Sequence, residues 1–266
     1  MTDLLEVRNL SKYYSFKNGW LRPTRACALE PINFSVKRGE TIAIMGETGS
    51  GKSTLAKLIA GAEIPSSGEI FLNGERLDPT NYQQRCREIR MIFQDSLGSL
   101  NPQLTIGKQL LEPLRFNTAW TPAEKQEHVY VTLQKVGLLP DHFDFYPHML
   151  SSGQQQRVCI ARAIILEPQI IVADEAFASL DPSIRAQIIN LILDLQEDMG
   201  ISFIFVSHSP EIVRHLADKI LIMHRGKMIE FDSTQALLTN PKEQLTKILL
   251  QSEQLNKALK HTTTQE

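Results

Sequence analysis

The stretch ETIAIMGETGSGKSTLAKLIAG, residues 40–61, decides the fold of this chain. Its apolar run at residues 40–46 predicts a buried strand, and the segment that begins at Lys52 predicts a helix that Gly61 can end at its C′ position. Between them, GETGSGKST at 46–54 matches the phosphate-loop pattern G-x-x-x-x-G-K-[ST]. Because a strand leads in and a helix leads out, the motif stands in the context that phosphate binding requires.

The chemistry of this loop explains its spacing. Small residues let the backbone wrap around a β-phosphate, consecutive N–H groups form an anion-binding nest, and Lys52 adds a positive charge. Ser53 can ligate Mg²⁺ through its hydroxyl. The loop therefore predicts a nucleotide site. Its predicted binding residues are Gly46, Glu47, Thr48, Gly49, Ser50, Gly51, Lys52, Ser53 and Thr54.

Two acidic residues, Asp174 and Glu175, end the segment IIVADE at residues 170–175. Adjacent strand residues point to opposite faces, so Asp174 can hold the Mg²⁺ shell while Glu175 faces a water in line with the γ-phosphorus. The alternative is a charged strand end that caps the next turn. His208 ends the next predicted strand, and taken alone it reads equally well as a buried structural histidine.

A second anion site is predicted at LSSGQQQR, residues 150–157, which starts a helix with serines in front and a basic, apolar-periodic run behind. Backbone N–H groups at such a helix start bind phosphate. Ser151 can offer its hydroxyl there, and Gly153 permits close backbone approach. A plain helix N-cap is the alternative interpretation.

The rest of the chain predicts an α/β architecture. LLEVRNL at 4–10 alternates as a half-buried strand does, and EIFLNGERL at 69–77 places Asn73-Gly74 as a hairpin turn, which indicates antiparallel sheet. From about residue 96 a helical insert begins. Its clearest helix is TPAEKQEHVYVTLQKVG at 121–137, with a Thr-Pro start, a capping box and a terminal glycine.

The α/β core then resumes. DPSIRAQIINLILDLQEDMG at 181–200 predicts a long helix, and ISFIFVSH at 201–208 a buried strand. A Ser-Pro pair at 209–210 starts another helix, and the final strand pair turns at Arg225-Gly226. An amphipathic helix that fades into a polar tail is predicted over residues 243–266.

Composition limits the possible partners. The 266 residues carry 28 Lys and Arg against 30 Asp and Glu, a net charge of −2, so no general attraction to nucleic acid or to anionic lipid is expected. Cys27, Cys86 and Cys159 fit neither a disulfide framework nor a metal cluster, which favours a reducing compartment. The N-terminus does not read as a signal peptide, and no apolar stretch is long enough to span a bilayer, so we expect a cytosolic chain.

In order and approximate spacing, several motifs together resemble the nucleotide-binding subunits of ABC transporters. The likeness covers residues from about 4 to 240. It rests on Lys52, Gln94, LSSGQ at 150–154, VADE at 172–175, SLDP at 179–182 and His208. The resemblance implies an α/β P-loop NTPase (RecA-like) core with an antiparallel β-subdomain and an inserted α-helical subdomain, and it implies ATPase activity with ATP and Mg²⁺.

The resemblance also assigns roles to residues. LSSGQ is the family's signature sequence, which contacts the ATP held by the other subunit of a head-to-tail dimer. Gln94 reaches the Mg²⁺ and the attacking water, and His208 orients the γ-phosphate and that water. Tyr14 stands where family members stack an aromatic ring on adenine, with Tyr13 as a competing choice. The implied contacts to the partner's ATP are Ser151, Ser152, Gly153, Gln154 and Asp181. The implied metal ligands are Ser53, Gln94 and, through water, Asp174.

A finer likeness is FQDSLGSLNPQLTIGKQLLEPL after Gln94, similar to the oligopeptide, dipeptide and nickel importer ATPases. Within that branch, the short tail and DEAFASLDPSIR look most like the F subunits of Sap antimicrobial-peptide transporters. Larger members of the branch carry a cysteine-rich C-terminal extension. This chain lacks that segment, so no iron–sulfur or zinc site is expected.

Three positions depart from the family pattern: Ser152 for the second glycine of the signature, Ala176 for a proline, and Ser209 for an aspartate. Ser209 is expected to be harmless, because serine and aspartate are both good N-caps ahead of Pro210. Ala176 is expected to be neutral. A positive φ at Ser152 would strain the backbone by roughly 1 kcal/mol and give a less active site for the partner's ATP.

The resemblance places the chain as a peripheral subunit on the cytoplasmic face of a bacterial inner membrane. Its expected partners are a second, related ATPase subunit, two transmembrane permeases and, indirectly, a substrate-binding protein. The expected cargo is peptide, with nickel or a polyamine as alternatives, and a soluble ABC protein of repair or translation is the rival class. The predicted domains are a core at 1–95 and 158–240, a helical signature subdomain at 96–157 and a C-terminal helix and tail at 241–266.

Overall fold

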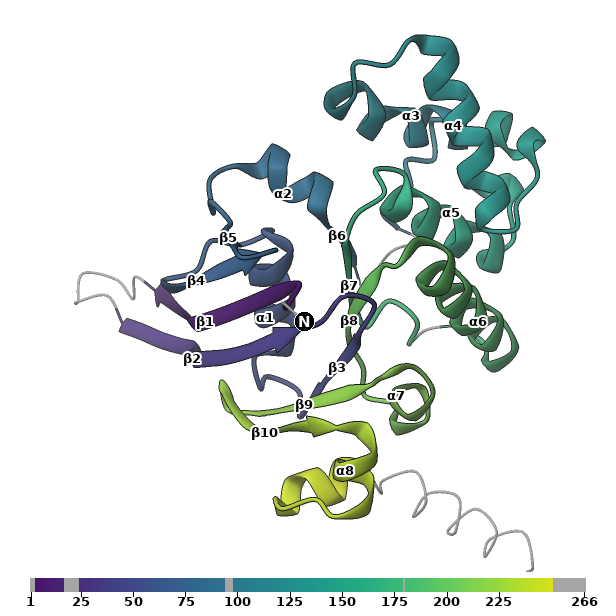
Figure 1. Cartoon of the computed structure of the whole chain (residues 1–266). Coiled ribbons are helices and arrows are strands. Elements are labelled where there is room, and N and C mark those ends of the chain that lie inside the picture. The colour runs from purple at the N-terminus through teal and green to yellow at the C-terminus, as the bar shows by residue number, and fades with distance from the viewer. Residues whose placement is uncertain (1–2, 17–23, 94–97, 179, 251–266) are drawn as a thin grey trace, which may run out of the picture. The chain divides into compact units, whose positions relative to one another are not determined.

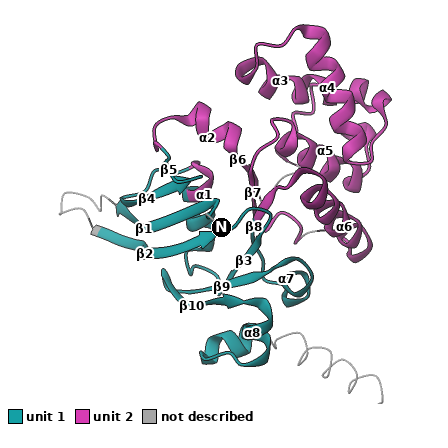
Figure 2. Ribbon diagram, in the orientation of Figure 1, with its two compact units in different colours: residues 1–58, 63–77, 204–266 teal, residues 59–62, 78–203 magenta. Residues whose placement is uncertain are grey.

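A computed structural model describes residues 3–16, 24–93, 98–178 and 180–250 of the chain (Figure 1). The chain divides into two compact units (Figure 2). Unit 1 contains residues 1–58, 63–77 and 204–266, and unit 2 contains residues 59–62 and 78–203. The domain boundaries predicted at residues 95 and 157 stay a prediction.

Helices and strands alternate along most of the chain (Figure 1). The strands are β1 Leu5–Phe16, β2 Thr24–Val36, β3 Thr41–Gly46, β4 Ser67–Leu72, β5 Glu75–Arg76, β6 Ile89–Ile92, β7 Ile170–Asp174, β8 Ser202–Val206, β9 Lys219–His224 and β10 Lys227–Ser233. The helices are α1 Lys52–Ala60, α2 Tyr82–Glu88, α3 Ile106–Asn117, α4 Pro122–Lys135, α5 Ser152–Ile164, α6 Pro182–Met199, α7 Pro210–Leu216 and α8 Thr234–Thr239. Short 3₁₀ helices at Pro140–Asp144 and Pro147–Met149 lead into α5. The described residues form one sheet of order β2-β1-β4-β5 and another of order β10-β9-β3-β8-β7-β6.

The antiparallel sheet of unit 1 confirms the predicted hairpin. Strand β1 pairs antiparallel with both β2 and β4, and β4 turns into β5 at Asn73-Gly74. These two turn residues have φ of 51° and 80°, the left-handed values that a tight turn of this kind requires. Asn and Gly tolerate this conformation better than other residues, which is why the dipeptide predicted the turn from sequence.

The strand that leads into the phosphate loop is buried along its whole length. Every residue of β3 is buried, and β3 runs parallel to β9 in register from Ile42 opposite Lys219 to Gly46 opposite Met223. Strand β9 then turns at Arg225-Gly226 into the antiparallel β10, as predicted. An apolar strand between others is typical of a parallel sheet covered on both faces. The same arrangement fixes where β3 ends, and therefore where the loop begins.

Unit 2 contains the parallel pair β6 and β7 and the helices α2 to α6. The predicted helix at 121–137 is confirmed as α4, with a capping box between Thr121 and Glu124. The backbone N–H of Thr121 donates to Glu124 Oε2 over 2.6 Å, and Glu124 N–H donates to Thr121 Oγ1 over 3.3 Å. Gly137, at φ 72°, follows its C-terminal end. The long helix predicted from residue 181 is α6, which ends at Gly200.

One helix of unit 2 was not predicted. Residues 82–88 form α2, which Asn81 caps by accepting a hydrogen bond from the backbone N–H of Gln84. Its sequence YQQRCRE has no apolar periodicity. Arg85 points inward and donates to the carbonyl oxygen of Ile59 over 2.8 Å, and burial lowers the pKa of this guanidinium.

The C-terminal part of the chain is only partly described. Residues 244–250 are helical, as predicted for the start of the amphipathic segment, and the remainder of that segment lies outside the described residues. Leu250 is buried, and its carbonyl accepts a hydrogen bond from Arg214 over 2.9 Å. Within the described ranges, no helix combines the length and the apolar composition needed to cross a membrane.

Candidate nucleotide-binding and hydrolysis site

The loop between β3 and α1 has the backbone of a phosphate cradle. Gly46, Gly49 and Gly51 have φ of 156°, 78° and 101°. Residues with a side chain rarely adopt these values, so the loop needs glycine at these places. Successive N–H groups in such a curved segment can point at one anion. The local geometry therefore fits the motif prediction.

Two of these glycines also lie against neighbouring backbone. A Cβ built on Gly46 would stand 2.2 Å from the carbonyl oxygen of Met223, and one on Gly51 would stand 2.6 Å from that of Ala28. The loop is further held by Gly226, whose N–H donates to the carbonyl oxygen of Ser50 over 2.9 Å. Strand β2 and the β9–β10 turn thus brace the loop, a support that the linear motif does not reveal.

The side chains of the loop fit a bound triphosphate. Lys52 is 4% exposed, and its ammonium donates to the carbonyl oxygens of Gly46 and Glu47 over 3.0 and 2.8 Å. Within the described chain, the buried hydroxyl of Ser50 has no hydrogen-bond partner. A buried donor without a partner is costly, so an anion in the cradle would satisfy it. Of the other predicted residues, Thr48 is exposed and Ser53 and Thr54 lie half-buried in the first turn of α1.

A histidine that the sequence reading did not select lies against this loop. His224, the last residue of β9, places Nδ1 3.3 Å from Glu47 Oε2. The contact has the distance of an ion pair without the geometry of a hydrogen bond. It forms because β9 runs beside β3, a neighbourhood that sequence separation hides.

Tyr14 lies at the side of the P-loop helix. Its hydroxyl donates to Glu63 Oε2 over 2.5 Å. Burial raises the pKa of Tyr14, Glu63 raises it further, and a hydrogen bond with the Thr54 side chain opposes these effects. The neighbouring Tyr13 is 43% exposed. Unit 1 therefore brings Tyr14 to the Thr54 end of the nucleotide-binding motif.

The predicted acidic pair ends β7 in unit 2. Asp174 is the last residue of the strand and is buried, whereas Glu175 is half-buried and has φ of 49°. A residue with a side chain seldom adopts that conformation, and such strain concentrates at functional sites. Sequence reasoning selected Glu175 for its carboxylate and gave no sign of its unusual backbone.

The signature segment starts α5 through a capping box. The hydroxyl of Ser151 accepts from the backbone N–H of Gln154 over 3.3 Å, and Gln154 Oε1 accepts from the backbone N–H of Ser151 over 2.9 Å. Ser151 and Ser152 are exposed at this helix start. Gly153 is buried, and a Cβ there would stand 3.3 Å from Ile184 of α6. Close packing of α5 against α6 is thus a second reason for glycine at position 153, and it was not predicted from the sequence.

Ser152 does not have the strained backbone that was considered for it. It is the first residue of α5, and it is absent from the non-glycine residues with positive φ in the described chain. The expectation of backbone strain at this position is therefore wrong. A helical residue has negative φ, so serine stands there without penalty.

This correction makes a prediction with a defined sign. Replacement Ser152→Gly is expected to lower the free energy of unfolding by about 0.5 kcal/mol, because glycine is the poorer helix former. Relief of strain would instead raise it. Chemical denaturation of the two proteins in the absence of nucleotide measures the difference. A more stable Ser152→Gly protein would restore the strain hypothesis.

A buried glutamine links the signature helix to the segment after Glu175. Gln156 is 1% exposed, and its amide donates to the carbonyl oxygen of Ala176 over 3.4 Å. Ala176 is itself buried. The sequence reading passed over Gln156 because glutamine on a helix usually faces water. Unit 2 therefore brings the signature helix and the end of β7 together.

The remaining predicted residues have simpler surroundings. Asp181 is the N-cap of α6, and its carboxylate makes no capping hydrogen bond to the described first turn. His208 is exposed, which excludes the buried structural reading. Ser209 is the N-cap of α7 as expected, but its side chain makes no capping hydrogen bond in the described structure, so capping does not explain its presence. Gln94 lies outside the described residues.

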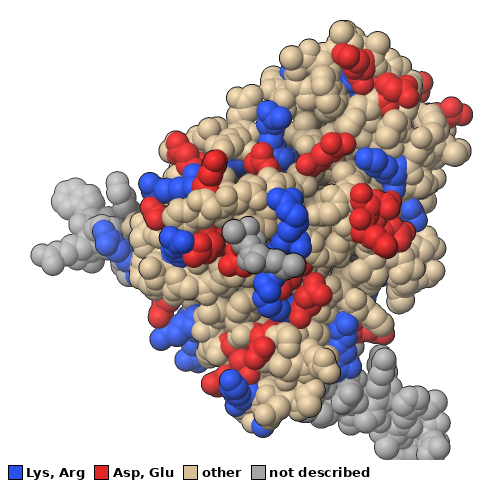
Figure 3. Space-filling view, viewed as in Figure 1, with Lys and Arg blue, Asp and Glu red and all other residues tan. Residues whose placement is uncertain are grey.

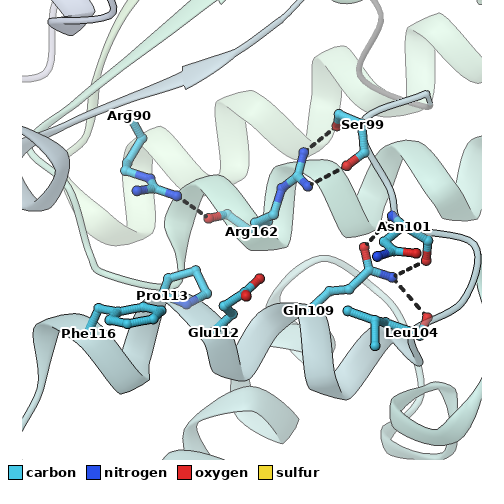
Figure 4. A pocket seen from close by; sticks show the side chains of 9 residues that line it. All are labelled: Arg90, Ser99, Asn101, Leu104, Gln109, Glu112, Pro113, Phe116 and Arg162. Atoms are coloured by element: carbon cyan, nitrogen blue, oxygen red, sulfur yellow. Dashed lines mark hydrogen bonds between the residues drawn. The ribbon is translucent and has the colours of Figure 1, made fainter.

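A pocket of about 360 Å³ opens in unit 2 (Figure 4). Arg90 donates to the carbonyl oxygens of Cys86 and Arg162, each over 3.4 Å, and Arg162 donates to Ser99. Phe116 lies at the rim and is 74% exposed. The full lining is Arg90, Ser99, Asn101, Leu104, Gln109, Glu112, Pro113, Phe116 and Arg162. Two guanidinium groups therefore face a cavity in which the described residues place no carboxylate within ion-pair distance of them.

The cradle, the strained glutamate and the capped signature helix define the class. The sequence profile of the family described as ABC transporter matches residues 29–178, and the chain belongs to this family. It is an ATP-binding and ATP-hydrolysing cassette.

The relatives narrow the family further. The putrescine export system ATP-binding protein SapF of Escherichia coli (strain K12) is 49% identical over 247 residues, which cover 93% of this chain and 92% of that protein. The peptide transport system ATP-binding protein SapF of Salmonella typhimurium is 48% identical over the same shares. The dipeptide transport ATP-binding protein DppF of Escherichia coli (strain K12) is 40% identical and is covered to 75% of its length.

A solved structure agrees with the fold. The ATP-binding cassette MJ0796, in a dimeric post-hydrolysis state bound to ADP and Pi, has a TM-score of 0.74 and 29% sequence identity. The match covers 86% of this chain and 98% of MJ0796. The predicted P-loop NTPase fold is thereby confirmed.

Proposed function

We propose that this chain powers a membrane transporter for peptides. The observation that supports this cargo is the 48% identity to a SapF protein named for peptide transport, together with the likeness to a DppF protein named for dipeptide transport. The SapF relative from strain K12 is named for putrescine export, so a polyamine is the second candidate cargo. Nickel remains an alternative cargo.

Residues of each unit are proposed to take part in ATP binding. The loop from Gly46 to Thr54 holds the phosphates, and Tyr14 stacks on adenine. Ser53, Gln94 and, through water, Asp174 would hold Mg²⁺, which would supply positive charge against the phosphate oxygens. The half-buried Ser53 hydroxyl in the first turn of α1 and the buried carboxylate of Asp174 are each chemically suited to this ion, because Mg²⁺ prefers oxygen ligands.

Hydrolysis is proposed to depend on three side chains. Glu175 accepts a proton from the attacking water, while Gln94 and His208 orient that water and the γ-phosphate. The place of the half-buried Glu175, directly after the buried strand β7, supports this assignment. The exposure of His208 supports it also, because a side chain open to solvent can reach a substrate.

The chain is proposed to be incomplete alone. In a head-to-tail dimer, its signature segment contacts the ATP held by a second, related cassette. Ser151 and Ser152 support this role, because they are exposed at the start of a helix whose dipole favours anions. The carboxylate of Asp181 supports it also, because it makes no capping hydrogen bond to the described first turn of α6. Gly153 and Gln154 complete the proposed contact. ATP binding closes the dimer, and hydrolysis reopens it.

The pocket of Figure 4 is proposed to bind a cytoplasmic segment of a permease. Arg90 is directed to carbonyl oxygens over long distances, and burial lowers the pKa of its guanidinium. A carboxylate from a partner would offset that cost. Phe116 adds an exposed apolar surface at the rim. Helices of the predicted 96–157 insert would then carry the motion of the cassette to the permeases.

We expect Phe116→Ser to weaken co-purification with the two permeases by about tenfold, because an exposed aromatic ring at an interface contributes roughly 1–2 kcal/mol. Its thermal unfolding should be unchanged, since the ring is 74% exposed in the isolated chain. The matched control is Ile248→Ser, which removes a side chain 55% exposed in the C-terminal segment. Equal loss in both variants would count against the pocket as the docking site.

The transporter proposal is tested by reconstituting the chain with its permeases and second cassette in lipid vesicles. Peptides are expected to stimulate ATP hydrolysis, while putrescine and Ni²⁺ are not. Stimulation by putrescine instead would move the cargo to a polyamine. Full ATPase activity of the purified chain without permeases would favour a soluble ABC protein of another class.

Surface charge supports a protein partner over nucleic acid. On the face drawn in Figure 3, acidic and basic side chains are interspersed, with no large patch of one sign. The net charge of −2 agrees with this mixture. A nucleic-acid-binding surface gathers Lys and Arg on one face. The proposed location is the cytoplasmic face of a bacterial inner membrane, reached through the permeases.

A further inference from the structure

We propose that Lys12 and Glu63 are positioning residues that hold the ring of Tyr14 flat against the adenine of bound ATP. The inference rests on the proposed function, in which Tyr14 stacks on the base. It adds two residues that belong neither to the phosphate loop nor to the signature segment.

The tip of the Tyr14 ring is tied to the segment that follows the P-loop helix. Its hydroxyl donates to Glu63 Oε2 over 2.5 Å. Glu63 is held in turn, because its backbone N–H donates to the carbonyl oxygen of Lys57 in α1 over 3.2 Å. A hydrogen bond to an ionised carboxylate is among the stronger ones in proteins. The hydroxyl end of the ring therefore moves with α1, the helix that the phosphate loop begins.

Lys12 covers one face of the same ring. Residues separated by two along a strand share a face, and the Lys12 ammonium lies 5.1 Å from the Tyr14 ring centroid. That ammonium also lies 3.5 Å from Glu63 Oε2 and donates to the carbonyl oxygen of Ile64 over 2.7 Å. A cation over an aromatic face is attracted to it. Lys12 thus covers one face of the Tyr14 ring and also pairs with the Glu63 carboxylate that accepts the hydrogen bond of the Tyr14 hydroxyl.

The ring so held lies beside the nucleotide-binding motif. The Thr54 side chain, in the first turn of α1, is within hydrogen-bonding reach of the Tyr14 hydroxyl. Tyr14 remains half-buried, so part of its surface is open to solvent. A base that stacks there gains from a ring whose orientation is already fixed, because less entropy is lost on binding.

Tyr13 has no comparable support. It is 43% exposed. Within the described chain, its backbone N–H and carbonyl oxygen form hydrogen bonds with the Ser66 hydroxyl. The cluster of Lys12, Glu63 and Thr54 therefore selects Tyr14 as the stacking ring.

The experiment compares two ligands that differ in the base. The non-hydrolysable ATP analogue AMP-PNP and inorganic tripolyphosphate are titrated into the full chain with Mg²⁺ by calorimetry. Tyr14→Ala is expected to weaken AMP-PNP about tenfold, and Lys12→Met and Glu63→Ala about fivefold. Binding of tripolyphosphate should be unchanged in all three variants. Lys12→Arg should restore AMP-PNP affinity, because a guanidinium can also cover the ring.

The matched control is Arg8→Met on the same strand. The Arg8 guanidinium lies 4.3 Å over the ring of Phe71, so its removal breaks a similar contact away from the site. Neither ligand should be affected. In the Tyr14→Ala background, Lys12→Met should cost nothing further, because the lysine acts through the ring.

Several outcomes would overturn the inference. Equal loss for both ligands in Lys12→Met would show a general structural role. No loss for either ligand, or a further loss in the double variant, would separate Lys12 from Tyr14. A wild-type chain that binds AMP-PNP no tighter than tripolyphosphate would reject base stacking itself. Failure of the wild-type chain to bind either ligand would reject the proposed function.

Discussion

Glu175→Gln is expected to slow ATP hydrolysis by the assembled transporter by about 100- to 1000-fold while ATP binding is retained. The amide keeps the shape of the side chain but cannot accept the proton of the attacking water, and general-base catalysis contributes a factor of this size. Because hydrolysis is proposed to reopen a head-to-tail dimer, the variant should accumulate in the closed, ATP-bound state. Steady-state phosphate release and gel filtration with ATP measure the two effects.

The matched control for this variant is Glu167→Gln. Glu167 is also a glutamate of unit 2 in the left-handed region, with φ of 51°, and its side chain is 61% exposed. It carries the same backbone strain without a proposed role in chemistry. The control should hydrolyse ATP at the wild-type rate. Wild-type turnover in Glu175→Gln, or an equal loss in both variants, would remove Glu175 from its catalytic role.

Gly51→Ala is expected to lower the midpoint of thermal unfolding by about 10 °C and to weaken ATP binding more than tenfold. Its Cβ would stand 2.6 Å from the carbonyl oxygen of Ala28, at a φ of 101°. Overpacking against backbone costs about 1–3 kcal/mol and the left-handed conformation about 1–2 kcal/mol more. Each kcal/mol shifts the midpoint by roughly 2–4 °C in a chain of this size.

Gly49→Ala separates the two causes. Gly49 also has positive φ, 78°, but a Cβ there would meet nothing within 4 Å. The thermal midpoint of Gly49→Ala should therefore fall by about 3 °C, the effect of the left-handed backbone conformation without the steric overlap. Scanning calorimetry without nucleotide compares the variants. Equal losses at the two positions would mean that the contact with Ala28 is unimportant, and that only backbone conformation requires glycine.

Local chemistry explains the successes of sequence prediction. The Asn73-Gly74 hairpin, the capping box at Thr121 and the glycine after α6 each depend on a few neighbouring residues. Such signals are complete within a short stretch of chain, so no distant contact is needed to read them. Helix α2 was missed for the converse reason, because Arg85 is buried through its contact with Ile59 and not through periodicity.

The candidate site divides in the same way. The phosphate loop and the acidic end of β7 were predicted because residue type and spacing carry their chemistry. Three features were not predicted: His224 beside Glu47, the hydrogen bond from Gln156 to the carbonyl oxygen of Ala176, and the positive φ of Glu175. Each results from the packing of segments far apart in sequence, or from a backbone conformation that packing imposes. The strain considered at Ser152 was wrong because the residue begins a regular helix.

By itself, the sequence determined the family, the phosphate-binding loop and the capped start of the signature helix. These follow from short motifs whose hydrogen-bonding groups are neighbours along the chain. Tertiary structure alone decided why Gly51 must be glycine, since Ala28 of a distant strand fills the space. It also brought Glu63, from the segment that follows α1, to the Tyr14 and Lys12 side chains of β1. Burial of a side chain depends on such meetings, which spacing along one strand does not encode.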